Sequence, residues 1–228
     1  TGTGKNTVPQ SLYQNCNSLN VVTICDSNLT TIEENAFNKT NFLTFIVNGK
    51  KGNVLPDSVS SIEAGAFDYS GIPSMNLSNT KITTIKDNCF ANSNLSEGFV
   101  FPKNVTTIGK EAFKNSYIED VNMPSSITKL EQGCFEGTYY LKNLVISSNV
   151  EEIPVNAFSS GEHVRSDRDY FVMDYRITPN VTISFSGSDT SKVKKIDKGA
   201  FNSCRIFNTD FLKAMPDLTS LGDYAFAA

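Results

Sequence analysis

The stretch VNMPSSITKLEQGCF, residues 121–135, contains the pattern that decides the fold. Its last six residues are a branched aliphatic residue, Leu130, three residues of variable type, the small residue Cys134, and then Phe135. Eight copies of this pattern occur along the chain. The other seven copies span Ile32–Phe37, Ile62–Phe67, Ile85–Phe90, Ile108–Phe113, Ile153–Phe158, Ile196–Phe201 and Leu221–Phe226.

The spacing of these phenylalanines predicts a repeat architecture. They lie 30, 23, 23, 22, 23, 43 and 25 residues apart. A period in the low twenties indicates a solenoid, in which each repeat packs only on its neighbours. We therefore expect a single repeat domain over residues 1–228, with about eight repeats of about 23 residues, which begins and ends within a repeat.

One repeat reads LKNLVISSNVEEIPVNAF, residues 141–158. Its first half follows the pattern L-x-x-L-x-L, which predicts a short strand with alternate side chains inward. The sequence SSN at 147–149 is a turn signal, and Ala157 and Phe158 close the coil. A repeat of this size has too little apolar surface to fold alone, so stability depends on the interfaces between repeats.

These features predict a mainly β leucine-rich-repeat solenoid, a right-handed superhelix. Short parallel strands, about 4.8 Å apart, should form a sheet on its concave face. The pattern I-x-x-x-A-F is too short for an α-helix, so the convex side should be irregular, with short strands or single 3₁₀ turns.

The repeat resembles that of the BspA-like leucine-rich-repeat proteins, most fully at 101–113 and 121–135. The proline that follows the strand in that family is present as Pro102 and Pro124, and the family's cysteine three residues after the phenylalanine is present as Cys204. The resemblance covers residues 8–228. It implies a non-enzymatic secreted or cell-surface protein of a microbe that acts in adhesion or binding.

Two of the spacings depart from the common period. The gap before Phe67 is seven residues longer, which fits a loop over residues 48–53. The gap before Phe201 is twenty residues longer, which indicates an insertion at about 159–180. Insertions in solenoids often carry function, but a surface hairpin with DYFVMDYRI, 169–177, as one strand is also consistent. The candidate binding residues of the insertion are His163, Arg165, Arg168, Tyr170 and Tyr175.

Composition excludes several kinds of partner. The chain is 39% hydrophobic and 19% charged, which is enough apolar material for a packed interior. Its net charge is −4 and it has no basic stripe, so nucleic acids and anionic membranes are not expected partners. No stretch of about 18 apolar residues is present, so no membrane insertion of this segment is expected.

Residues that could perform chemistry are few. Cys89 and Cys134 take the place of alanine in the repeat and are interpreted as buried small residues. Cys16 and Cys204 share a repeat position but lie about seven repeats apart, over ~30 Å, so no disulfide is expected between them. There is no C-x-x-C motif, and His163 is the only histidine. We therefore expect no catalytic residues, no cofactor and no metal site.

The outward side chains of the predicted sheet form the candidate binding face. They are small and mostly uncharged, with a few exposed apolar residues, which suits a protein or glycan partner held by many weak contacts. A merely solvent-tolerant β face is equally consistent. A first row comprises Val21, Thr44, Ser74, Gly98, Asp120, Asn143 and Thr182. The candidate binding row comprises Thr23, Ile46, Asn76, Val100, Asn122, Val145 and Ser184.

We expect a non-enzymatic binding or adhesion module, extracellular or on the cell surface, that recognises a host or extracellular-matrix protein. The alternative is a structural spacer or scaffold within a larger surface protein, with the binding site elsewhere. The sequence leaves the ligand and the oligomeric state open.

Overall fold

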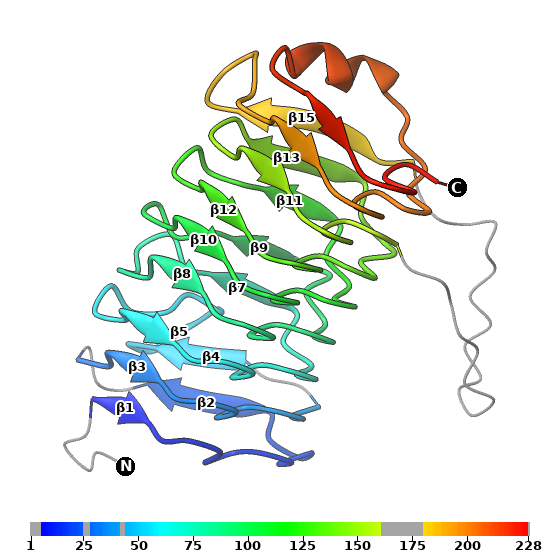
Figure 1. The fold of residues 1–228 in the computed structure, drawn as a ribbon. Helices are drawn as coiled ribbons and strands as arrows, with labels where there is room; N and C mark the ends of the chain where they lie inside the picture. Colours follow the sequence, from blue (N-terminus) through cyan, green and yellow to red (C-terminus); the bar gives the residue numbers. More distant parts are fainter. Residues whose placement is uncertain (1–5, 25–27, 42–43, 161–179, 228) are drawn as a thin grey trace, which may run out of the picture.

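The computed structural model describes residues 6–24, 28–41, 44–160 and 180–227, which form one continuous stack of coils (Figure 1). Most coils contribute one strand to each of two layers, and nearly all strand pairs are parallel, as the repeat predicts. The long-strand layer contains β2 (Val21–Ile24), β4 (Thr44–Val47), β7 (Ser74–Asn76), β9 (Gly98–Val100), β11 (Asp120–Asn122), β13 (Asn143–Ser147) and β15 (Thr182–Ser186).

The second layer consists of two-residue strands at the start of each I-x-x-x-A-F segment. Their pairing is in register from coil to coil, so each inward aliphatic side chain lies on the one before it. This confirms short strands on the side opposite the sheet. The layer contains β1 (Thr7–Val8), β3 (Thr31–Ile32), β6 (Ser61–Ile62), β8 (Thr84–Ile85), β10 (Thr107–Ile108), β12 (Lys129–Leu130), β14 (Glu152–Ile153), β16 (Lys195–Ile196) and β17 (Ser220–Leu221).

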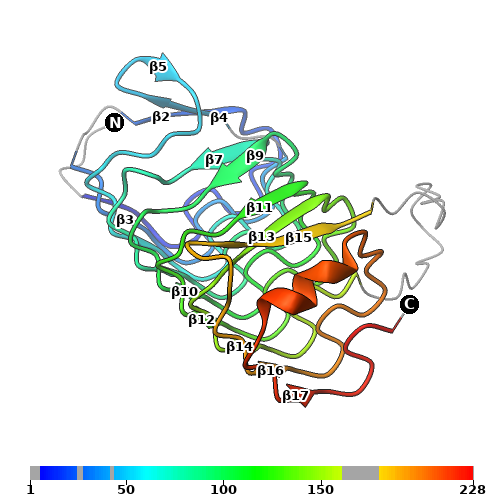
Figure 2. The same ribbon diagram turned by 90° about the horizontal axis from the view of Figure 1, so that it is seen from above.

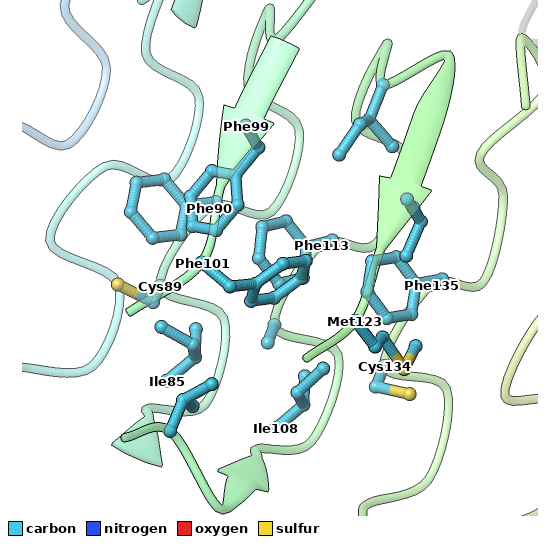
Figure 3. Packing of buried hydrophobic residues seen from close by; sticks show 14 of the residues in the cluster. Ile85, Cys89, Phe90, Phe99, Phe101, Ile108, Phe113, Met123, Cys134 and Phe135 are labelled. Atoms are coloured by element: carbon cyan, nitrogen blue, oxygen red, sulfur yellow. The ribbon is translucent and has the colours of Figure 1, made fainter. Parts of the chain in front are cut away.

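A ladder of aromatic rings runs through the core. The repeat phenylalanines stack face to face from Phe37 to Phe226, and Tyr13 extends the ladder by one ring. Successive ring centroids lie 4.8–5.6 Å apart, with interplanar angles of 0–17°. Figure 3 shows the central part, where Phe99 of β9 meets Phe90 and Phe113 edge-on at 5.0 and 4.8 Å. Offset stacks and edge contacts are both favourable aromatic geometries.

The small residue before each phenylalanine lets the coils approach closely. Ala36, Ala66, Ala112 and their counterparts are fully buried, and Cys89 and Cys134 are buried in the same position, as predicted. The backbone N–H of every repeat phenylalanine from Phe37 to Phe201 donates to the carbonyl of the small residue one coil on, as from Phe90 to Ala112 at 2.8 Å. A larger side chain would occupy the space between the coils.

Each coil turns at residues with left-handed backbone. The residue two positions before the stacked ring has a positive φ in each of the nine coils that the structure describes: Ser11, Asn35, Gly65, Asn88, Glu111, Gly133, Asn156, Gly199 and Tyr224. Asn and Gly adopt this conformation most readily, which explains why they recur at this point of the repeat. A second left-handed position follows two residues after the phenylalanine in most coils, as at Asn92 and Asn115.

The seven extra residues before Phe67 form a hairpin, where the sequence predicted a loop over 48–53. β5 (Lys50–Lys51) pairs antiparallel with the end of β4, and the turn between them contains Asn48 and Gly49. β4 is therefore an additional strand in the long-strand layer, whereas β3 and β6 pair directly in the other layer. Phe45 of β4 is fully buried and meets Phe37 and Phe67 edge-on, at 5.5 and 6.1 Å.

The twenty extra residues before Phe201 do not interrupt the stack. Phe158 and Phe201 lie 5.3 Å apart and are nearly parallel, like neighbours separated by 23 residues. β13 pairs directly with β15 over five residues. The proposed hairpin strand at 169–177 lies outside the described residues.

A short 3₁₀ helix, η2 (Thr209–Ala214), lies beside β15 near the C-terminal end (Figure 2). Its Phe211 is buried, with its ring centroid 6.1 Å from those of both Phe201 and Phe226. The helix thus covers the edge of the aromatic ladder where the last two coils meet.

Replacing one ring of the ladder should destabilise the whole stack. Phe113 is fully buried between Phe90 and Phe135, so Phe113→Ala should lower the free energy of unfolding by about 3–5 kcal/mol. Urea unfolding followed by circular dichroism measures the loss. Phe207→Ala is the control because that ring is 72% exposed. Equal losses in the two variants would show that the ladder is not the main source of stability.

Two glycines with similar φ separate backbone strain from crowding between coils. Gly137 (φ +73°) would place a Cβ only 2.1 Å from Asn115 Oδ1, whereas a Cβ on Gly49 (φ +75°) would meet nothing within 4 Å. Gly49→Ala should cost about 1–2 kcal/mol for the left-handed backbone alone. Gly137→Ala should cost clearly more in the same unfolding experiment. An equal cost would mean that the asparagine moves aside freely.

Candidate functional site: the long-strand face

The outward side chains of the long strands lie in the predicted rows, except that Thr44 of the first row is buried and not outward. Strand pairing places Thr23 beside Ile46, Asn76 beside Val100, and both Asn122 and Ser184 beside Val145. Because the register is kept from coil to coil, these side chains share one face. Val100 is 47% exposed, and Ile46 and Val145 are half-buried.

The row has a member that the sequence analysis missed. Ile46 and Asn76 are not neighbours, because Val54 stands between them and bridges Asn76 in parallel. The amide of Asn76 donates to Asn53 O at 2.7 Å, and the amide of Leu55 donates to Asn76 O at 3.3 Å. The true strand position of this repeat is therefore 53–55. The signal was present as Leu55-Pro56-x-x-Val59, which matches Phe101-Pro102-x-x-Val105.

Two hollows lie on this part of the face, and the inserted hairpin borders one of them. One, of about 730 Å³, lies between the hairpin and the segment 54–57 and is bordered by Lys50, Lys51 and Asn79. The other, of about 330 Å³, lies over β7, β9 and β11 and is bordered by Glu97, Gly98 and Asp120. Val54 borders both hollows, so they are neighbours on this face, and it is 41% exposed. We refer to the two hollows together as the groove. In Figure 2 the β4–β5 hairpin stands out from the rest of the stack.

Several polar side chains of the face are held in place. Asn76 Oδ1 accepts a hydrogen bond from the amide of Ser78 at 3.0 Å. Asn143 Nδ2 donates to Asp120 Oδ1 at 2.6 Å, and Lys142 pairs with Glu119 at 2.6 Å. The face is thus a prearranged surface, which reduces the entropy lost when a partner binds.

The insertion leaves and re-enters the stack at neighbouring points. The amide of Ser160 donates to Asn202 O at 3.0 Å, and the amide of Val181 donates to Arg205 O at 2.7 Å. Ser160, Val181 and Arg205 also border one small hollow. The predicted binding residues His163, Arg165, Arg168, Tyr170 and Tyr175 lie outside the described residues.

The described residues contain no evident centre for chemistry. Cys16, Cys89, Cys134 and Cys204 are free thiols. Burial raises the pKa of Cys89 and Cys134 above the ordinary value and that of Cys204 to about 12, so these thiols stay protonated at neutral pH. Within the same residues, no group of three His, Cys, Asp or Glu side chains could hold a metal ion.

A family model described as "BspA type Leucine rich repeat region" matches the chain in six copies, over residues 3–54, 51–165 and 180–228. The chain belongs to the BspA-type leucine-rich repeat proteins. This confirms the predicted family, and the alternation of strand layers confirms the solenoid fold. The family assignment makes the chain a repeat scaffold of a kind suited to binding. A search of curated proteins found no significant match.

Solved structures with the same fold come from bacteria. A leucine-rich repeat protein from Bacteroides ovatus matches 96% of this chain with a TM-score of 0.59 and 19% identity. A leucine-rich repeat protein of T. pallidum matches 97% with a TM-score of 0.52 and 18% identity, covering 80% of that protein. A leucine-rich cell-surface protein from Faecalibacterium prausnitzii matches 96% with a TM-score of 0.50 and 18% identity, covering 66% of that protein.

The BspA-type chain spans 43% of the length of the Bacteroides protein, so that protein is more than twice as long. At these identities the likeness concerns the fold alone. Among the described residues of our chain, no helix is long and apolar enough to cross a membrane.

A row of polar side chains beside the aromatic ladder converges from both directions on a half-buried carboxylate, Asp68. Asp68 accepts hydrogen bonds from Asn38 Nδ2 at 3.1 Å and from Asn92 Nδ2 at 2.9 Å. Asn115 Nδ2 donates in turn to Asn92 Oδ1 at 3.0 Å. Burial nevertheless raises the pKa of Asp68 above its ordinary value, because it outweighs these bonds and the attraction of Lys39.

This shift predicts how the stability of the BspA-type chain depends on pH. The folded pKa exceeds the unfolded one, so the contribution of Asp68 is complete below about pH 4 and is lost as pH rises through the folded pKa. The free energy of unfolding of the wild type, minus that of Asp68→Asn, should therefore fall between pH 3 and pH 7. Urea titrations at several pH values measure this difference. A difference that is constant or rises with pH would contradict the assignment.

Proposed function

We propose that this chain is a non-enzymatic binding module, secreted or displayed on a cell surface, that recognises a host or extracellular-matrix protein. The observation that carries the proposal is the long-strand face. Its side chains are held in register over many coils and include solvent-exposed Val54 and Val100. Isolated exposed apolar residues are ordinary, but several in one ordered row provide contact area for a partner.

The mechanism is recognition by many weak contacts on a rigid frame. The aromatic ladder fixes the coil spacing, and the spacing fixes the distances between outward side chains. The insertion at 159–180 is a second element of the proposed site, since its ends are tied to the stack at Ser160 and Val181. No cofactor or metal is needed for such binding.

The proposed location is supported by the family and by the structural likeness to a leucine-rich cell-surface protein of Faecalibacterium prausnitzii. A spacer or scaffold role, with the binding site elsewhere in a larger protein, is the second candidate. It is favoured by the regularity of the stack, which could serve simply to hold other parts apart.

The first experiment measures binding of the purified chain to an array of fibronectin, fibrinogen, laminin and collagens, with glycans alongside. The wild type should bind at least one protein, and Val100→Lys should weaken that binding about tenfold. Thr107→Lys is the matched control, because Thr107 lies in the same coil on the short-strand layer.

A further variant in which residues 162–178 are replaced by a Gly-Ser linker tests the insertion. Loss of binding in this variant alone would place the site on the insertion. Loss in Val100→Lys alone would place the site on the sheet. If the folded wild type binds none of the proteins and glycans, the adhesion proposal fails and the spacer role is favoured. Binding to glycans alone would contradict a protein partner.

A further inference from the structure

We propose that the groove beside the β4–β5 hairpin binds a short extended segment of a protein partner, with an apolar side chain between an acidic and a basic one. This inference rests on the proposed binding function and specifies where, and by which chemistry, the partner is recognised. Four features of the groove carry it: its origin, its floor, its charges and its length.

The groove lies where the repeat before Phe67 has an additional strand in the long-strand layer. β4 is an additional strand of the long-strand layer and pairs with β2. The segment that pairs with β7 of the next coil comes later, at 53–55. The junction is rigid: the amide of Phe45 donates to the buried Asn53 Oδ1 at 2.9 Å, and the amide of Gly52 donates to Phe45 O at 3.1 Å. The hairpin therefore forms a fixed wall at one end of the groove.

The floor of the groove is apolar where the two hollows meet. Val54 and Val100 are 41% and 47% exposed, and Asn76 lies between them with its side chain held toward Ser78. Gly98, two residues before Val100 on the same strand, has φ +113°, a conformation in which other residues are strained, and leaves its position without a side chain. An apolar side chain of a partner can therefore settle on either valine, and on Val100 it would lie beside this gap.

The charges at the two ends have opposite sign. Lys50 and Lys51, with Asp57, border the hairpin end and give it a net positive charge, and Glu97 and Asp120 border the other end. Among the described residues, Lys50, Lys51 and Glu97 form no ion pair, whereas Lys142 and Lys195 on later coils are paired with glutamates. Unpaired charges at the rim can be satisfied by a partner with the reverse order of charges.

This arrangement favours a peptide over other ligands. A polyanion would be repelled by Glu97 and Asp120, and Asp57 adds a further negative charge at the hairpin end. A sugar ring would find no exposed aromatic face, because Phe99 is the only aromatic residue that borders the two hollows among the described residues, and it is buried. From Val54 to Asn122 the groove crosses three strand intervals, about 14 Å, or about four extended residues.

The test uses a phage-displayed library of random twelve-residue peptides, panned on the intact chain. Enriched peptides should carry an acidic, an apolar and a basic residue within about four positions. Val54→Lys should weaken their binding about tenfold or more. Leu212→Lys is the matched control, because Leu212 is 40% exposed on η2 and borders neither hollow.

A second variant tests the direction of the charges. The double change Lys50→Glu and Lys51→Glu keeps two exposed side chains and should abolish selection for the acidic residue without lowering thermal stability. Failure to enrich any sequence, or enriched peptides that bind Val54→Lys as well as wild type, would overturn the proposal. Binding of the wild type to a matrix protein, unchanged in both variants, would overturn the groove while leaving the binding function standing.

Discussion

The face-to-face stacking of one aromatic ring per coil is the interaction on which the rest of this structure depends. A ring can lie on its predecessor only if each coil advances by the same small step, and that step sets the pairing of both strand layers. The step in turn requires a small residue before the ring and a left-handed residue before that. Three adjacent positions of the repeat thus control the spacing of every surface side chain.

This constraint acts unequally on the two layers. The rings and short strands tolerate no extra residue, and the seven additional residues before Phe67 are accommodated entirely in the long-strand layer. Phe45 enters the core edge-on against two rings and so leaves their stacking intact. The hairpin changes the shape of one face while the ladder behind it continues unchanged.

The parts of the structure that repeat were predictable from the sequence, and the parts that occur once were not. The register of Val121, Leu144 and Ile183 follows from periodicity alone, since each takes the same place in its repeat. The hairpin was predicted as a loop because its length was visible but the pairing of Lys51 with Ile46 was not. Val54 was missed because the sequence analysis placed the strand of this repeat at β4, although Pro56 marked the strand at 53–55. The charges of the groove come from residues 50 to 120, and only the coiling brings them to one place.

The passage of the ladder across the 43-residue gap has a consequence for how such proteins diversify. Phe158 and Phe201 stack at 5.3 Å, within the range of the other pairs, and the backbone is hydrogen-bonded on both sides of the junction at Ser160 and Val181. Because the free energy of closing a loop rises only slowly with its length, about 0.6 kcal/mol per doubling, the stack is nearly indifferent to what lies between these two points. Insertions of different sequence can therefore replace one another at this junction during evolution, while the stack of coils on either side stays the same.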